Sequence, residues 1–168
     1  MKRKNEKYLF YKNESRKGTY LGKEGVCYEG LHVVAHYPFT KLNIIWQILS
    51  IICFREHSCQ YQLRDPNDNV LCKCQVTRPI WFFKFVPNKN KSYHIGPCET
   101  PVEYRGNGYY PYLLTYILNK DNGGESYDYY MIINEKNIKS IRGVEKAGFT
   151  LWGFGRKKHG QYVLSEIK

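Results

Sequence analysis

Alternating apolar and polar residues predict strands through much of the chain, because side chains of a half-buried strand point to opposite faces in turn. The candidate segments are residues 8–11, 31–37, 58–64, 70–76 and 80–86. Pro and Asn/Asp residues at 65–69 supply a turn between two of them, so 58–76 is a predicted hairpin. Cys72 and Cys74 would then share one face of the sheet, where two small apolar residues are commoner than a redox pair.

The densest apolar run is residues 40–54, where apolar side chains fill more than one face of a helix. It is shorter than the ~20 residues that span a bilayer, so we expect no transmembrane segment. Three interpretations stay open, in this order: a buried helix, a contact between two copies in a homodimer, and a helix lying on a membrane surface.

The second half of the chain reads as two strand and helix units in succession. A strand that begins near Tyr93 leads to a glycine turn and an apolar helix, and a strand at 127–133 leads to a second helix within 134–149. Because a helix joins the two strands, we expect them to run parallel. Residues 150–155 and 162–167 are expected to close the chain as an antiparallel pair. The apolar face of the first helix carries Leu113, Leu114, Ile117 and Leu118.

The glycine turn Arg105-Gly-Asn-Gly108 predicts an anion site at the start of the first helix. Its two glycines can adopt positive φ at little steric cost, so successive backbone N–H groups can converge on a phosphate there. Pro111 falls in the first turn of the helix, where a missing N–H costs little. The alternative is a plain connection between a strand and a helix.

Two motifs in this half resemble the GNAT superfamily of acyl-CoA-dependent N-acyltransferases. The signature of that family is Arg/Gln-x-x-Gly-x-Gly/Ala before a helix, then Asn-x-x-Ser/Ala and Glu-Lys-x-Gly-Phe on the next helix. The chain has Arg105–Tyr110 in the first place, and Asn137–Ser140 with Glu145–Phe149 in the second. The resemblance covers the chain from about Tyr93 to the C-terminus. It implies an α+β (α/β) fold with a mixed, mostly antiparallel central sheet, a splayed parallel pair of central strands and flanking helices.

The resemblance also implies acetyl-CoA as cosubstrate, with its pantetheine arm in the gap between residues 94–101 and 127–134. Backbone N–H groups would polarise the thioester carbonyl at one end and hold the pyrophosphate at the other. Asn137 matches a position that contacts the arm in the family, and it suits a helix N-cap equally well. The residues implied for cofactor contact are Cys98, Glu99, Thr100, Arg105, Gly106, Asn107, Gly108, Tyr109, Tyr110, Asn137 and Ser140.

Three positions depart from the family pattern. Tyr110 stands where the signature has a small residue, which predicts a shifted helix start or an aromatic wall beside the cofactor. Val144 stands where many members carry a tyrosine proposed to protonate the departing CoA thiolate. Gly96-Pro97 occupies the part of the central strand where many members place a carboxylate base.

Glu99 is the first candidate for the catalytic base, because it lies on the central strand near the implied thioester. His94 is the second candidate, and strand alternation places it on the other face of the sheet. Both residues also suit structural roles, as an ion-paired surface carboxylate and a hydrogen-bonded strand histidine. We interpret Cys98 as a core residue, because direct transfer without an acyl-enzyme is the usual route in the family.

Length predicts a single domain, residues 1–168, with residues 1–7 disordered. The six cysteines lack the spacing of paired zinc ligands, so we expect neither a disulfide framework nor structural zinc. His32 and His36 lie in a β-branched run without a third ligand nearby, and we expect no metal there. No cleavable signal sequence opens the chain, so we expect reduced cysteines and a cytoplasmic location.

The formal net charge of +11 predicts a surface that attracts anions. Lys and Arg gather in blocks at 2–7, 84–91 and 156–158. The blocks do not identify the anion: solvated loop lysines, CoA phosphates, a nucleotide-linked substrate, RNA and an acidic membrane all stay open. The aromatic content of 16% exceeds that of a disordered basic tail, so we expect a folded protein.

The function implied by the resemblance is an N-acetyltransferase that moves the acetyl group of acetyl-CoA to a primary amine by direct attack. The residues of these motifs are similar to those of small family members associated with cell-surface polysaccharide synthesis. This similarity implies that the acceptor is an amino sugar, free or linked to a nucleotide. The charge motivates a second hypothesis, acetylation of an aminoacyl-tRNA or a protein lysine, although we do not favour a nucleic-acid partner. The departures at Val144 and Gly96-Pro97 motivate a third, a non-catalytic module that binds CoA or another anion.

Overall fold

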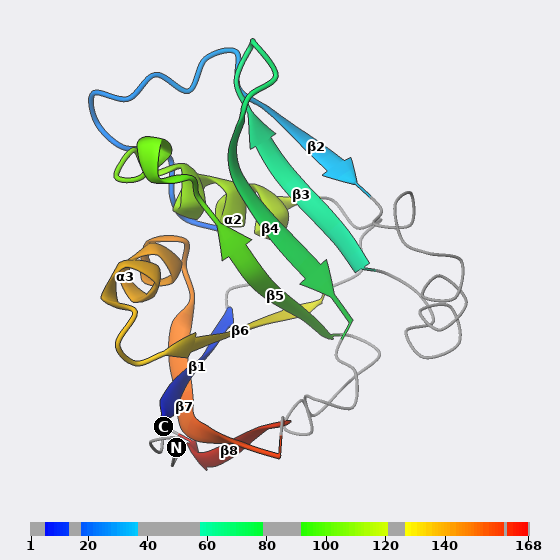
Figure 1. Ribbon diagram of the computed structural model, residues 1–168, viewed down its shortest axis with the longest axis vertical. Helices are drawn as coiled ribbons and strands as arrows, with labels where there is room; N and C mark the ends of the chain where they lie inside the picture. Colours follow the sequence, from blue (N-terminus) through cyan, green and yellow to red (C-terminus); the bar gives the residue numbers. More distant parts are fainter. Residues whose placement is uncertain are drawn as a thin grey trace.

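A single mixed sheet of eight strands forms the frame of the computed structural model (Figure 1). The strands are β1 (Lys7–Asn13), β2 (His32–His36), β3 (Ser58–Arg64), β4 (Val70–Thr77), β5 (Ser92–Glu99), β6 (Asp128–Asn134), β7 (Thr150–Lys158) and β8 (Gln161–Ile167). The helices within the described residues are α2 (Tyr109–Asn119) and α3 (Ile138–Lys146), with a short 3₁₀ turn, η3 (Val102–Tyr104). The structure describes residues 6–13, 18–36, 58–78, 92–120, 127–159 and 161–167.

The strand order is β2-β3-β4-β5-β6-β1-β7-β8, and β5 and β6 are its parallel pair. Every other neighbouring pair is antiparallel. The fold class predicted from the sequence is therefore confirmed. The strands predicted within the described ranges, the hairpin and the two helices are confirmed as well. The predictions for residues 40–54, 80–86 and 84–91 fall on residues outside the described ranges.

The parallel strands β5 and β6 separate soon after they begin to pair. They are hydrogen-bonded from Ser92 opposite Asp128 to His94 opposite Tyr130. Both strands continue beyond this point without pairing to each other. The pair is thus splayed, as the resemblance implied, and backbone groups along the diverging edges have no partner in the facing strand.

The main core lies between one face of the sheet and the two helices. Leu113 and Leu114 of α2 are fully buried, and the helix contacts β3 and β4. Cys72 and Cys74 are also fully buried, on the same face of β4 as predicted. Val144 of α3 belongs to the same apolar cluster. Each such side chain contributes about 1.5–3 kcal/mol when its apolar surface leaves water, which fixes α2 and α3 against the strands.

Strand β5 carries a bulge in the middle of its pairing with β4. Cys98 lies opposite Cys74, and Ile95 lies opposite Val76, so β5 uses one residue more than β4 over the same length. Gly96 lies within this stretch with a φ of +145°, a conformation that favours glycine. The extra residue reverses the alternation of side chains, so that Ile95 and Cys98 face the same side.

The bulge corrects the predicted position of His94. Glu99 lies opposite Lys73 and His94 lies opposite Thr77, and these two partners share one face of β4 because they are four residues apart. His94 and Glu99 therefore share the face of the sheet that lies away from Cys74. The prediction of opposite faces assumed a regular strand, and the inserted residue makes it wrong.

Candidate functional site

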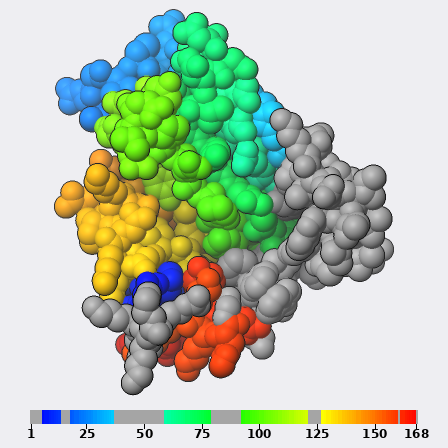
Figure 2. Space-filling view, in the orientation of Figure 1, coloured from blue at the N-terminus to red at the C-terminus, as the bar shows by residue number. Residues whose placement is uncertain are grey.

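A cavity of about 850 Å³ opens between the carboxyl end of β5, the start of α2 and one side of α3. Figure 2 shows the green atoms of the turn before α2 next to the yellow-orange atoms of α3. Residues predicted for cofactor contact that line the cavity are Cys98, Glu99, Thr100, Arg105, Gly106, Gly108, Tyr109, Tyr110, Asn137 and Ser140. Asn107 and His94 are not part of its lining.

The glycine turn has the backbone conformation that its sequence predicts. Gly106 and Gly108 have φ of +86° and +80°, and Gly108 is the N-cap of α2. The first helical hydrogen bond runs from the Tyr112 N–H to the Gly108 carbonyl at 3.1 Å. No side chain of the described residues caps this helix end, so its first N–H groups are available to an anion.

Residues 18–31 contribute a latch on the glycine turn, formed by Lys23 and Tyr28. The Tyr28 hydroxyl donates to the Asn107 carbonyl at 2.7 Å, and the Lys23 ammonium donates to the Gly106 carbonyl at 2.8 Å. The backbone N–H of Lys23 donates to the Tyr28 hydroxyl at 3.1 Å. The Tyr28 ring stacks on Tyr112 of α2, with ring centres 4.6 Å apart. The latch thereby fixes two carbonyls of the turn against the N-terminal segment.

Holding these carbonyls also orients the N–H groups of the turn. In a planar trans peptide the N–H points opposite to the C=O of the preceding residue. The N–H groups of Asn107 and Gly108 therefore point away from the atoms that bind the carbonyls of Gly106 and Asn107. Two positive φ values and two fixed carbonyls together define the shape of the turn.

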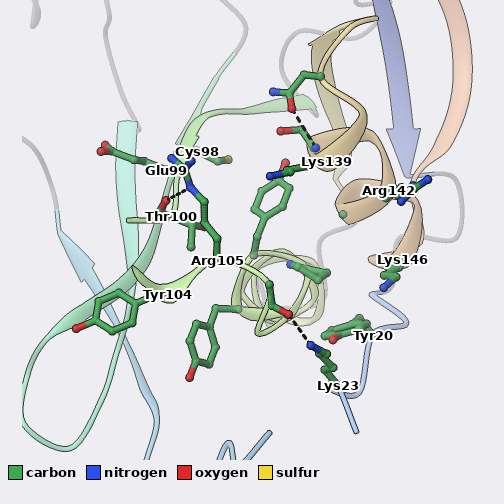
Figure 3. A pocket seen from close by; sticks show the side chains of 18 residues that line it. Tyr20, Lys23, Cys98, Glu99, Thr100, Tyr104, Arg105, Lys139, Arg142 and Lys146 are labelled. Carbon is green, nitrogen blue, oxygen red and sulfur yellow. Dashed lines mark hydrogen bonds between the residues drawn. The ribbon is translucent and has the colours of Figure 1, made fainter. Parts of the chain in front are cut away.

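Cationic side chains surround the start of α2 (Figure 3). Lys139, Arg142 and Lys146 come from α3, where their spacing places them along one side of the helix. Lys23 and Arg105 add two further cations to the lining, in which Glu99 is the carboxylate. A cavity with this balance of charge attracts an anion with several negative groups.

Sequence reasoning missed these cations except Arg105. The three cations of α3 could have been found from their spacing, because residues three, four and seven apart share a helix face. For Lys23 no local signal exists, since it reaches Gly106 across 83 residues of chain. The Arg105 side chain already uses one of its donors, because its Nε donates to the Thr100 carbonyl at 2.9 Å.

Asn137 and Ser140 meet at the start of α3, on the other side of the cavity. The Asn137 side chain accepts a hydrogen bond from the Ser140 N–H at 3.2 Å, so Asn137 is the N-cap of the helix. The side-chain oxygen of Asn137 is used in this cap. Its amide nitrogen is the part of the side chain that can still donate to a ligand.

Tyr110 forms an aromatic wall of the cavity. The helix begins at Tyr109, directly after the glycine turn. A Cβ atom on Gly143 of α3 would lie only 2.5 Å from the Tyr110 ring, so the ring rests on that glycine. Burial, together with the nearby Cys98 thiol, raises the pKa of Tyr110 well above its usual range and keeps the phenol neutral. Val144, at the position of the family's tyrosine, is buried in the core.

The two candidate bases have different surroundings. Glu99 lines the cavity, is exposed, and forms an ion pair with Lys73 at 2.9 Å. His94 lies outside the lining, close to the Gly96 backbone. Desolvation lowers the pKa of His94 to about 4, so its imidazole is neutral at pH 7 and a weak base. The geometry therefore favours Glu99 over His94.

Among the described residues, the potential metal ligands do not cluster and the cysteines are not bridged. No group of three or more His, Cys, Asp or Glu among these residues could hold a metal ion. The cysteines that the structure describes are free thiols, namely Cys27, Cys59, Cys72, Cys74 and Cys98. No helix in the described ranges is long and apolar enough to cross a membrane.

Comparison with known proteins identifies the fold. No family model matches the sequence, and no curated protein matches it. Among solved structures, a Drosophila protein from a structural genomics consortium matches with a TM-score of 0.54 and 8% identity, over 90% of this chain and 49% of that one. A GNAT-family acetyltransferase from Colwellia psychrerythraea matches with a TM-score of 0.53 and 12% identity, over 97% of this chain and 56% of that one. The chain spans about half the length of both proteins, and at these identities the likeness shows a GNAT-like fold alone.

Proposed function

We propose that the chain is an N-acetyltransferase that takes the acetyl group from acetyl-CoA and transfers it to a primary amine. One observation carries this proposal. The parallel strands separate beyond His94, and β5 then ends at a cavity lined by a glycine turn and by cations from three segments. An unpaired strand edge that leads to a glycine turn surrounded by cations suits a ligand with an extended amide arm and a phosphorylated end.

The lining residues divide into two parts that match such a ligand. Lys23, Arg105 and the cations of α3 would hold its phosphates, together with the N–H groups at the start of α2. The unpaired edge of β5 up to Thr100 would hold its amide arm by backbone hydrogen bonds. Acetyl-CoA, when bound, supplies a thioester whose carbonyl carbon is open to attack by an amine.

The transfer that we propose needs a neutral amine, a thioester and a group that takes up the proton of the amine. The amine nitrogen bonds to the acyl carbon, the carbon–sulfur bond breaks, and a proton of the amine passes to Glu99 or to water. A thiol has a reference pKa of ~8.5, so it leaves largely as thiolate and takes a proton from solvent. The buried Val144 cannot donate a proton, and turnover does not require it to, because the thiolate can leave without one.

Calorimetric titration with acetyl-CoA tests the cofactor part of the proposal. The parent protein is expected to bind, and Arg142→Gln is expected to weaken binding by ~10-fold, because a hydrogen bond to a charged group contributes about 1.5–3 kcal/mol. Lys158→Gln is the matched control, since Lys158 is exposed on β7 and outside the cavity lining. No heat at millimolar acetyl-CoA, or equal losses in the two variants, would contradict the proposal.

A specific observation favours a second candidate, a module that binds CoA or another anion without catalysis. The position of the family's tyrosine is buried as Val144, and Tyr110 stands between Gly143 and Cys98 in the region implied for the cofactor arm. Tight binding of CoA together with no transfer to a broad panel of amines would support this candidate over the enzyme.

A further inference from the structure

A second, smaller cleft of about 200 Å³ meets the large cavity at Glu99. Its lining comes from β3, β4 and the end of β5, and consists of Gln60, Gln62, Val70, Lys73, Glu99 and Pro101. Glu99 is the residue that lines both spaces. Glu99, the residue that the geometry favours as the base, thus borders both spaces, and Figure 3 shows its carboxylate turned away from the cationic side chains of the large cavity.

The polar side chains of the cleft form a hydrogen-bond chain with a fixed direction. Arg64 donates to the Gln62 side-chain oxygen from two nitrogens, at 2.7 and 3.1 Å. Because arginine can only donate, this oxygen must face it, and the Gln62 amide nitrogen must point onward. That nitrogen donates to the Gln60 side-chain oxygen at 2.7 Å. The chain therefore runs from Arg64 through Gln62 to Gln60.

The direction of the chain determines what Gln60 presents to the cleft. Its side-chain oxygen is occupied, so its amide nitrogen is the free end, and no described residue accepts a hydrogen bond from it. Lys73 adds an ammonium that contacts Glu99 at 2.9 Å. The cleft thus offers hydrogen-bond donors for oxygen atoms on one side and a carboxylate for an amine on the other.

We propose that this cleft is the subsite for the acceptor, and that it takes a small primary amine whose carbon skeleton carries oxygen atoms, as in an amino sugar. This inference rests on the proposed acetyl transfer. The amine would lie against Glu99, where the cleft meets the large cavity, and its oxygens would accept from Gln60 and Lys73. An apolar amine of the same size would displace water from the Gln60 donors without offering them a new partner.

The test compares glucosamine with cyclohexylamine, a ring of the same size without oxygen atoms. The parent is expected to acetylate glucosamine with a kcat/KM at least ~10-fold above that for cyclohexylamine. Gln60→Leu is expected to raise the KM for glucosamine by ~10-fold and to leave acetyl-CoA affinity unchanged. The KM for cyclohexylamine is expected to fall in this variant, because the unpaired amide donors are gone. Lys73→Met, which keeps the length of the side chain, is expected to change the glucosamine KM in the same direction.

Gln75→Leu is the matched control, because Gln75 lies opposite Gln60 on β4 and lines neither space. Equal rates with the two amines overturn the inference, and so does an unchanged glucosamine KM in both Gln60→Leu and Lys73→Met. Acetyl-CoA binding without transfer to either amine overturns it as well. Calorimetry separates these outcomes from failure of the proposed function, in which acetyl-CoA does not bind to the parent at all.

Discussion

Replacing Tyr28 by phenylalanine removes one hydroxyl group from the latch and keeps the ring that stacks on Tyr112. The hydroxyl takes part in two hydrogen bonds, one to the Asn107 carbonyl and one from the Lys23 N–H. Each contributes about 0.5–1.5 kcal/mol net, so the free energy of unfolding is expected to fall by about 1–3 kcal/mol. The lower end is expected because the latch lies near the surface, where water replaces part of each bond.

The same substitution is expected to weaken CoA binding at least ~5-fold, since a freed turn must be ordered again when the ligand binds. Calorimetry with CoA measures this loss, and thermal unfolding measures the change in stability. Tyr116→Phe is the control, because Tyr116 lies on α2, the helix that Tyr28 stacks against, and its side chain is exposed. If Tyr28→Phe binds CoA as the parent does, the latch does not position the turn, and the reasoning from the fixed carbonyls is refuted.

Tyr28→Phe gives a clearer answer than a substitution in the glycine turn itself, such as Gly108→Val. The positive φ of Gly108 predicts that valine there lowers CoA affinity by at least ~10-fold. However, a Cβ on Gly108 would lie 2.7 Å from the Tyr28 hydroxyl and would also meet the Tyr20 hydroxyl. Gly108→Val therefore damages the latch as well as the turn. A Cβ on Gly106 meets nothing within 4 Å, so Gly106→Ala tests the positive φ by itself.

Three other predictions concern the wall and the two candidate bases. Gly143→Ala is expected to lower the free energy of unfolding by about 1–3 kcal/mol, because the new methyl group meets the Tyr110 ring. In thermal unfolding, the double variant with Tyr110→Ala is expected to lose less stability than the two single variants lose together. The pKa of His94 is about 4 in the folded protein and about 6.5 in the unfolded chain, so the unfolded chain takes up a proton at a higher pH. The free energy of unfolding, measured with denaturant, is therefore expected to fall by up to about 3 kcal/mol from pH 6.5 to pH 4. His94→Gln is expected to reduce this dependence on pH. Glu99→Gln is expected to lower turnover in steady-state assays and to leave CoA affinity nearly intact.

The sequence could predict those features that depend on neighbouring residues. Alternation of side chains predicted the hairpin, and the order of strand, glycine turn and helix predicted the parallel pair. The positive φ values of Gly106 and Gly108 followed from the need for a tight turn before a helix. In each case the cause acts within a few residues, where steric and capping rules are strongest.

The features that could not be predicted depend on contacts across the chain. Tyr28 reaches Asn107 over 79 residues, and nothing near Tyr28 marks it as part of a site. The bulge at Gly96 left no clear signal either, because a glycine and a proline in a strand are also compatible with a strand that simply ends. Because of this one inserted residue, His94 lies on the same face of the sheet as Glu99.

The pairing of Tyr110 with Gly143 shows how a departure from a motif can be balanced elsewhere in the fold. The family pattern has a small residue at position 110, which leaves room beside the helix start. Here the large residue stands at 110 and the small one at 143, on the helix across the cavity, so the ring of Tyr110 fits between α2 and α3. The ring lies near the Cys98 thiol, and both residues line the cavity. This part of the cavity wall is thus formed by a pair of residues on two helices, and the sequence alone shows only Tyr110 as a departure from the motif.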